Sequence, residues 1–190
     1  MLQFVLTEVK KLTALTVGTK GRGSMAAQLL YTIGYEGSSV DSFVRALQDA
    51  GVGRVIDVRC VPISRKRGFS KQALAHEMDC RGIEYVHIGA LGNPKPGREA
   101  ARIGDFQGFY RIYHSHLTSS AAQVALEQAT ALALETTSCL LCFESDHQNC
   151  HRALVAQAMT QRNHFEVAHL RAQNHEERDH FEDVGSTCGA

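Results

Sequence analysis

Hydrophobic and polar residues alternate along this chain in a way that predicts strands separated by helices. Short apolar runs, several of them rich in β-branched residues, predict five strands at residues 29–33, 54–58, 83–88, 138–143 and 165–170. Val40, Phe43, Val44 and Leu47 recur at helical spacing, so residues 38–50 should form the first helix. Further helices are predicted at residues 70–80, 106–117, 121–135 and 150–159.

Turn and capping residues support these boundaries. Ser38 or Ser39 is placed to cap the first helix, while Gly51 and Gly82 lie where helices should end. Loops are expected at residues 59–68 and, because of its Gly and Pro content, at 91–97. Alternating strands and helices predict a single-domain α/β fold with an open, mostly parallel sheet and helices on both faces. This is a Rossmann-like three-layer sandwich.

The pattern also predicts where the domain begins and ends. Residues 29–171 should form the α/β domain. Residues 1–28 lack sustained periodicity and should be a disordered or over-extended N-terminal segment, with Met25 as an alternative start. Residues 172–190 carry little that could be buried, so we expect a polar C-terminal tail.

Composition narrows the class of protein and its location. The chain has 190 residues, 44% apolar and 21% charged, and its 20 basic and 20 acidic residues cancel. Net charge therefore gives no general attraction to nucleic acid or to an anionic membrane. No apolar run is long enough to span a membrane, and Glu8, Lys10 and Lys11 interrupt the N-terminal apolar stretch. We expect a cytoplasmic protein without a membrane partner; its oligomeric state is not predicted.

The loops that follow the strands carry most of the unusual chemistry. In open α/β sheets, ligands bind beyond the carboxyl ends of the strands, near the N-termini of helices. The corresponding segments here are GYEGSS, RCVPISRKRG, GALGNPKPG and ESDHQN. Gly34 and Gly37 would permit a tight turn and a close backbone approach, although they do not form a dinucleotide-binding fingerprint.

The segment after the second strand is strongly basic. Between Arg54 and Lys71 there are six basic residues and one acid, Asp57. Guanidinium groups suit a phosphate or carboxylate ligand, but Lys66 and Arg67 are also consistent with a solvated loop. Asp57 and Arg59 share one face of the strand end, where they could form a structural ion pair or contact a ligand.

The segment CFESDHQNCHR, residues 142–152, concentrates chemically active side chains after an apolar strand. Asn149 or Asp146 could cap the helix that follows, which would place Cys150, His151 and Arg152 in its first turn. Free backbone N–H groups there favour an anion, and the same field would lower the pKa of Cys150. Glu144 could pair with an arginine or act as a general base.

Three interpretations of this segment are open. The residues could form a buried structural network around Glu144. They could bind zinc through Cys142, Glu144 or His147, Cys150 and His151, but the spacing contains no C-x-x-C pair. They could instead form an anion-binding or catalytic pocket with Glu144, His151 and Arg152, and with Cys150 as a candidate nucleophile. We favour the pocket, and we predict no metal ligands and no particular cofactor.

Several motifs in order resemble those of the family called Domain of Unknown Function 488. They are TIGYEGSSVDSF, VIDVRCVPISRKRGFS, IEYVHIGALGNPK, GFY and CFESDHQNCHR, and the resemblance covers the chain from Tyr31 to Met159. The resemblance implies a compact, mostly bacterial or archaeal intracellular α/β domain without an established activity. One departure is His147, where relatives often have proline. The resemblance places candidate site residues at Gly34, Asp57, Arg59, Ser64, Arg65, Glu144, Cys150, His151 and Arg152.

Two functional hypotheses follow. In the first, the protein is an enzyme that acts on a phosphorylated or nucleotide-like small molecule. Arg59, Arg65 and Arg152 would hold the anion, and Glu144 or His151 would transfer a proton. In the second, it is a non-catalytic module whose basic loop, residues 59–71, binds the backbone of RNA or DNA.

Overall fold

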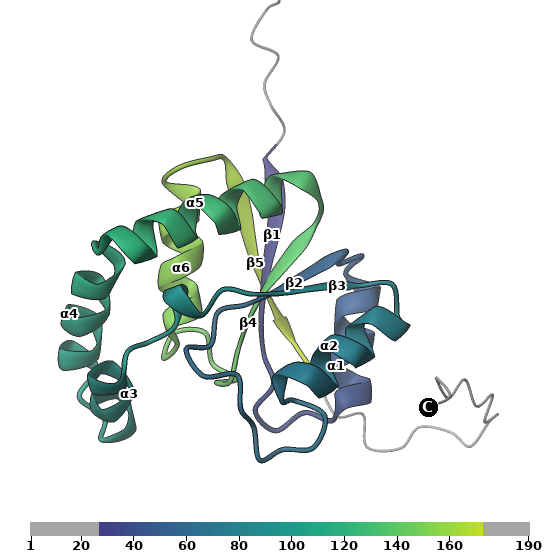
Figure 1. Cartoon of the computed structure of the whole chain (residues 1–190), viewed down its shortest axis with the longest axis horizontal. Helices are drawn as coiled ribbons and strands as arrows, with labels where there is room; N and C mark the ends of the chain where they lie inside the picture. The colour runs from purple at the N-terminus through teal and green to yellow at the C-terminus, as the bar shows by residue number, and fades with distance from the viewer. Residues whose placement is uncertain (1–26, 173–190) are drawn as a thin grey trace, which may run out of the picture.

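Five parallel strands form one sheet in the order β3-β2-β4-β1-β5. This computed structural model describes residues 27–172 (Figure 1). The strands are β1 (Gln28–Gly34), β2 (Arg54–Asp57), β3 (Glu84–His87), β4 (Ser138–Cys142) and β5 (Phe165–Arg171). The helices are α1 (Val40–Asp49), α2 (Lys71–Cys80), α3 (Lys95–Arg102), α4 (Phe106–Leu117), α5 (Ser120–Glu135) and α6 (His151–Thr160), with a 3-10 turn, η1 (Gly89–Leu91).

Helices cover both faces of the sheet. On one face α1 and α2 pack against residues that include Val55 and Leu141, and on the other α3 to α6 pack against residues that include Ile56 and Leu140 (Figure 1). Neighbouring residues of a strand therefore enter opposite cores, as strand alternation requires. Burial on both faces explains why the strands have continuous apolar sequences. The predicted three-layer α/β sandwich with a parallel sheet is confirmed.

The local signals that set the helix boundaries act largely as predicted. Ser39 caps α1, and its side chain accepts a hydrogen bond from the backbone N–H of Ser42 at 3.1 Å. Gly51 and Gly82 follow α1 and α2 with φ of 64° and 67°, a left-handed conformation in which glycine ends a helix without steric cost.

Residues 91–97 differ from the prediction of a simple loop. The second half of this segment begins α3, with Pro94 at the N-cap and Pro96 within the first turn. Proline is tolerated there because the first backbone N–H groups of a helix have no intrahelical partner. Two prolines that indicated a loop thus mark the start of a helix, and α3 brings further residues to the carboxyl edge of the sheet.

Part of the predicted domain organisation lies outside the described residues. The N-terminal segment up to residue 26, including the alternative start at Met25, and the tail from residue 173 are not described. Within residues 27–172, no helix is both long enough and apolar enough to cross a membrane.

Candidate functional site

Two cavities adjoin at the carboxyl edge of the sheet. The larger has a volume of about 610 Å³ and the smaller about 300 Å³, and Asn93, Arg98, Glu144 and His151 line both. The loop after β2, residues 59–66, forms much of the remaining wall of the larger cavity. Residues from α3 and α4 line the smaller one. Both cavities lie where ligands bind in parallel α/β domains, beyond the carboxyl ends of the strands.

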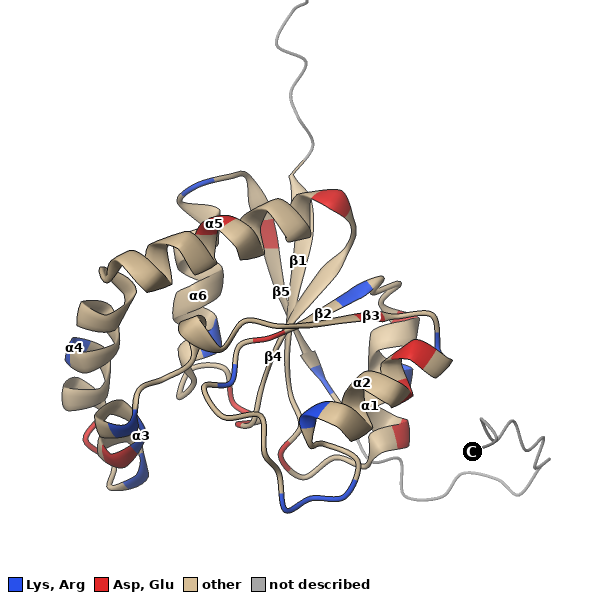
Figure 2. Ribbon diagram, in the orientation of Figure 1, with Lys and Arg blue, Asp and Glu red and all other residues tan. Residues whose placement is uncertain are grey.

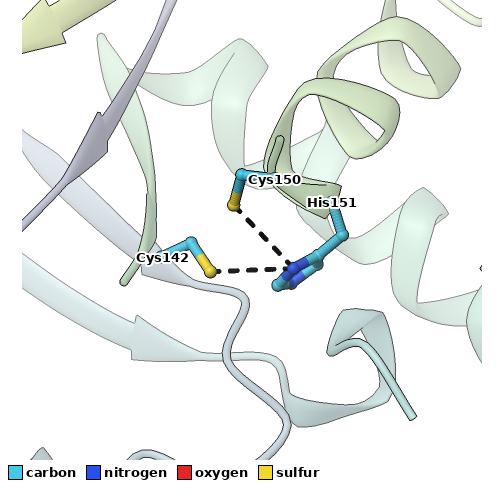
Figure 3. A group of neighbouring side chains, drawn as sticks. All are labelled: Cys142, Cys150 and His151. Atoms are coloured by element: carbon cyan, nitrogen blue, oxygen red, sulfur yellow. Dashed lines mark hydrogen bonds between the residues drawn. The ribbon is translucent and has the colours of Figure 1, made fainter. Parts of the chain in front are cut away.

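A compact cluster of side chains lies where these cavities meet. Cys142 ends β4, and Cys150 and His151 begin α6 (Figure 3). The Nδ1 atom of His151 lies 3.6 Å from the sulfur of Cys142 and 4.0 Å from that of Cys150. Both thiols donate to Oε2 of Glu144, at 3.3 Å from Cys142 and 3.2 Å from Cys150. Each sulfur therefore contacts both the imidazole and the carboxylate.

Burial and close contact shift the pKa values of all four groups. Burial, with the Cys150 sulfur nearby, raises the pKa of Glu144 to about 7. Burial opposes ionisation of Cys150, but the hydrogen bond from Cys142 and the proximity of His151 outweigh it and hold the pKa of Cys150 well below its usual value. The hydrogen bond to Cys150 raises the pKa of Cys142, and contact with Cys150 outweighs burial to raise the pKa of His151.

The other nitrogen of His151 is also occupied. Its Nε2 atom lies 2.9 Å from the backbone carbonyl oxygen of Val58, just after β2. A carbonyl can only accept, so Nε2 carries a proton and donates it. The neutral imidazole therefore has its lone pair on Nδ1, directed at the two sulfurs.

Arg152 holds the β4–α6 loop in place. Its side chain is only 1% exposed, and its guanidinium donates to the backbone oxygens of Glu144 and Ser145 and to Oγ1 of Thr32. Arg152 thus contacts the backbone of Glu144, while the Glu144 carboxylate contacts the two thiols. All three guanidinium nitrogens already have protein partners, so this arginine is placed to position the loop.

Gly34 lets the same loop approach β1 closely. A Cβ atom built on Gly34 would lie 1.7 Å from the backbone oxygen of Glu144 and 2.5 Å from its carbonyl carbon. Only a residue without a side chain fits there. The close approach expected of Gly34 is observed, and its partner is the backbone of the candidate proton-transfer residue.

Asp57 and Arg59 form a buried ion pair at the base of the larger cavity. Arg59 donates through Nε to both carboxylate oxygens, at 2.9 and 3.0 Å, and Nη2 lies 2.5 Å from Oδ2. Its Nη1 donates to the hydroxyl of Tyr35 and to the carbonyl of Phe69, and Tyr85 donates to Asp57. Of the two open interpretations, the structural ion pair describes these contacts, although Arg59 also lines the cavity.

The basic loop contributes more accessible cations. Ser64, Arg65 and Lys66 line the larger cavity, and Arg65 is exposed. The Ser64 hydroxyl accepts from the backbone N–H of Lys66 at 3.1 Å, which shapes the turn. Figure 2 shows a short run of Lys and Arg residues, in blue, along this loop.

Two residues of the cavity walls were missed by sequence reasoning. Asn93 is 6% exposed, and its Oδ1 atom has no hydrogen-bond partner within the described part of the chain. Arg98 is exposed on α3 and donates to the backbone oxygen of Asn93. The motif GNPK pointed to the neighbourhood of Asn93, but Arg98 lies in a helix that was not predicted.

The predicted cap of α6 is wrong. Cys150 occupies the N-cap position and makes no capping hydrogen bond through its side chain. Asp146 instead accepts from the N–H of Gln148 and from the side chain of Asn149, so both polar residues stabilise the loop. His151 and Arg152 lie in the first turn as expected.

Fold and site together define a parallel three-layer α/β domain with a cleft of charged and apolar side chains at the carboxyl edge of its sheet. The chain belongs to the family described as Domain of unknown function DUF488, whose model matches residues 39–159. That region includes α1 to most of α6 and nearly all residues of the cleft, although Gly34 and the cavity-lining Tyr35 precede it. Searches of curated proteins and of solved structures found no match to this chain.

Proposed function

We propose that this protein is an enzyme that hydrolyses a phosphorylated or nucleotide-like small molecule in the cleft. The main support for this function is the position of Glu144 and His151, which line both cavities beside a set of cationic side chains. A proton-transfer group and anion-binding groups around one ligand-sized space are the usual components of a hydrolytic site.

The cations of the cleft support an anionic substrate. Arg65, Lys66 and Arg98 line the larger cavity from two different segments, so they can reach one phosphate from different directions. Arg98 donates to a neutral backbone oxygen and keeps its charge available for a ligand. The unpartnered Oδ1 of Asn93 would accept a hydrogen bond from a ligand hydroxyl or amine. In this proposal the buried Arg59 and Arg152 position the site instead of binding the substrate directly.

Exposed apolar side chains beside these cations support a ligand that also carries a ring. Val61 is 51% exposed, Ile63 77% and Phe143 44%, and all three line the larger cavity. Apolar groups with this exposure, next to the cationic side chains of the same cavity, suit the flat face of a base or the body of a sugar. A nucleotide or a related compound combines both features.

Glu144 is the proposed general base, and water is the proposed nucleophile. Burial and the adjacent sulfur raise the pKa of this carboxyl to about 7, a value suited to proton exchange near neutral pH. Cys150 is only 2% exposed, which leaves a substrate atom little access to its sulfur. Glu144 would take a proton from water as the water attacks and return it to the leaving group.

A ligand screen tests this proposal. The purified protein is heated with nucleotides or sugar phosphates, and an authentic ligand at 100 times its Kd should stabilise it by about 2.7 kcal/mol. For a chain of this size, that corresponds to about 5–10 °C in Tm. Arg98→Ala should weaken binding by roughly 10- to 100-fold because it removes a charged hydrogen-bond donor.

Two further variants separate binding from chemistry. Glu144→Gln should retain the ligand-induced shift but lower turnover by about 10²- to 10⁴-fold. Arg81→Ala is the matched control, since this arginine pairs with Glu77 on α2 and lines neither cavity. Equal ligand shifts in the wild type and in Arg98→Ala would place the ligand outside the cleft and contradict the proposal.

A second candidate function is supported by the exposure of the basic loop. Arg65, Arg67 and Lys71 are exposed beside Val61 and Ile63, a combination that can contact phosphates and bases of a nucleic acid. In this case the loop would bind RNA or DNA without turnover. The enzyme would depend on Glu144, whereas the nucleic-acid-binding module would depend on Lys66 and Arg67.

Salt-dependent binding distinguishes the two functions. If the loop binds nucleic acid, the double variant Lys66→Ala/Arg67→Ala should reduce the slope of log K against log salt by about one for each lost phosphate contact. Glu144→Gln should leave both affinity and slope unchanged. Fluorescence anisotropy with labelled single- and double-stranded oligonucleotides measures both quantities. An unchanged slope in the double variant would eliminate the binding module.

A further inference from the structure

We propose that Cys142, Cys150 and His151 form a zinc-binding site. Their two sulfurs and one imidazole nitrogen lie within 4.8 Å of one another (Figure 3). Tetrahedral zinc with Zn–S bonds of about 2.3 Å and Zn–N bonds of about 2.0–2.1 Å places its ligand atoms about 3.6–3.8 Å apart. The sulfur-to-Nδ1 distances of 3.6 and 4.0 Å are close to these values. The metal therefore fits with small adjustments of side chains.

The hydrogen bond of His151 to the backbone of Val58 suits this side chain to bind a metal. The Val58 carbonyl accepts the proton of Nε2, which leaves Nδ1 unprotonated in the neutral ring and directed at the sulfurs. Zinc-bound histidines typically donate their other N–H to a carbonyl or carboxylate, which fixes the ring and increases its basicity. The same backbone contact fixes the orientation of the ring relative to β4.

Charge and ligand type favour zinc over harder cations. Thiolates are soft ligands and imidazole is a borderline one, and both suit zinc, whereas Mg²⁺ and Ca²⁺ prefer oxygen. All three side chains are buried, with exposures of 4%, 2% and 6% for Cys142, Cys150 and His151. Both cysteines would bind as thiolates, and their two negative charges would neutralise Zn²⁺, so no net charge would be buried. A divalent cation thus gives the buried thiols a common partner.

Glu144 lies where the open position of such a site would be. Its carboxylate contacts both sulfurs and lines both cavities, so the fourth zinc position would face the cleft beside it. Catalytic zinc sites have three protein ligands and one water, and a Cys₂His set is one of the known combinations. In zinc deaminases of nucleobases, a glutamate beside such a set transfers protons without binding the metal.

This site deepens the proposed hydrolytic function, and its chemistry rests on that function. A zinc-bound water would lose a proton to Glu144, and the resulting hydroxide would attack the electrophilic centre of the substrate. Glu144 would then return the proton to the leaving group, so that one water is consumed for each bond broken. The zinc ion would supply the nucleophile that the buried Cys150 cannot.

Metal content is the direct test. Protein purified under reducing conditions without added chelator should contain about one zinc per chain by plasma mass spectrometry. Cobalt(II) added to the metal-free protein should produce the near-ultraviolet charge-transfer absorption of thiolate coordination. Cys142→Ala and Cys150→Ala should each lower zinc affinity by at least about 100-fold and weaken that band.

Cys139→Ala is the matched control. Cys139 lies on the same strand as Cys142 and is fully buried, but it is outside the three-residue group. This variant should keep full zinc content and an unchanged cobalt spectrum, while circular dichroism verifies that each variant is folded. The proposal is overturned if the wild-type protein binds neither zinc nor cobalt. It is also overturned if Cys139→Ala loses metal as completely as Cys142→Ala.

The test separates the metal site from the proposed enzyme activity. Stoichiometric zinc in a protein that turns over no phosphorylated compound would support the site and remove the hydrolase. Ligand binding and turnover by protein that cannot bind zinc or cobalt would support the hydrolase and overturn the site. Titration of zinc into metal-free protein without any substrate keeps the two readouts independent.

Discussion

Replacing Gly34 with alanine is expected to destabilise the protein by at least about 3 kcal/mol, the upper end of the usual cost of overpacking. The new Cβ would lie 1.7 Å from the backbone oxygen of Glu144 and 3.1 Å from Nη1 of Arg152. Neither obstacle can rotate away, because one is backbone and the other is a buried guanidinium that also bonds to the carbonyls of the loop. The loop must therefore move away from β1.

The substitution should also disrupt the candidate site, because the displaced backbone includes Glu144. Any folded fraction of Gly34→Ala should lose both ligand-induced stabilisation and zinc affinity. Urea denaturation of the wild type and the variant measures the loss in the free energy of unfolding.

Gly53→Ala provides the control for this substitution. Its added Cβ would meet mainly the side-chain hydroxyl of Thr136, at 2.6 Å, and this side chain can rotate. We expect a cost of about 1 kcal/mol, typical of an ordinary substitution. If Gly34→Ala were no more costly than Gly53→Ala, the close approach of the β4–α6 loop to β1 would be incorrect.

Asp57→Asn should destabilise the protein by about 3–5 kcal/mol, the usual cost of removing one partner of a buried ion pair. Asp57 is fully buried and Arg59 only 5% exposed, so the guanidinium would lose its counterion in a region with little water. Burial opposes the charge of Arg59, but the hydrogen bond to Asp57 outweighs this effect and raises its pKa, so the arginine stays charged. Equilibrium denaturation measures the loss.

An exposed ion pair offers a comparison within the same molecule. Glu77 and Arg81 pair at i,i+4 on α2, with half-exposed side chains, and Glu77→Gln should cost only about 0.3–0.5 kcal/mol. The double variant Asp57→Leu/Arg59→Met should cost less than the sum of its single changes, because it removes both charges together. A cost of Asp57→Asn as small as that of Glu77→Gln would show that water reaches the pair.

The fold was predictable because its signals are local and repeated. Strands buried on both faces produce continuous apolar runs, and helices between them produce the three- and four-residue spacing of α1. The whole of α3 was missed because Pro94 and Pro96, at its start, are typical of loops as well as of the first turn of a helix. The cap of α6 was wrongly assigned because Asp146 uses its oxygens within the preceding loop.

The candidate site was predictable in its location but less so in its internal arrangement. The position of segment 142–152 after a buried strand indicated the edge of the sheet. Sequence could not show that the Arg152 guanidinium is used by backbone carbonyls, since those contacts depend on the path of the loop. The spacing of Cys142, Cys150 and His151 argued against a metal because a strand end and a helix start, separated by a loop, match no short motif. Their proximity becomes visible only in three dimensions.

The strand order has a consequence for how the chain reaches its native state. β4 lies between β1 and β2, although at least 80 residues separate it in sequence from each of them. Until β4 is synthesised, β1 has neither of its partners, and one edge of β2 is unpaired; such edges invite non-native pairing. Contacts between residues so far apart slow folding. Insertion of β4 joins β1 to β2 and places Cys142 opposite Gly34, and α6 and β5 follow β4 in sequence. The sheet and the candidate site are therefore completed only late in synthesis, and chaperones that shield open sheet edges should affect the yield of both together.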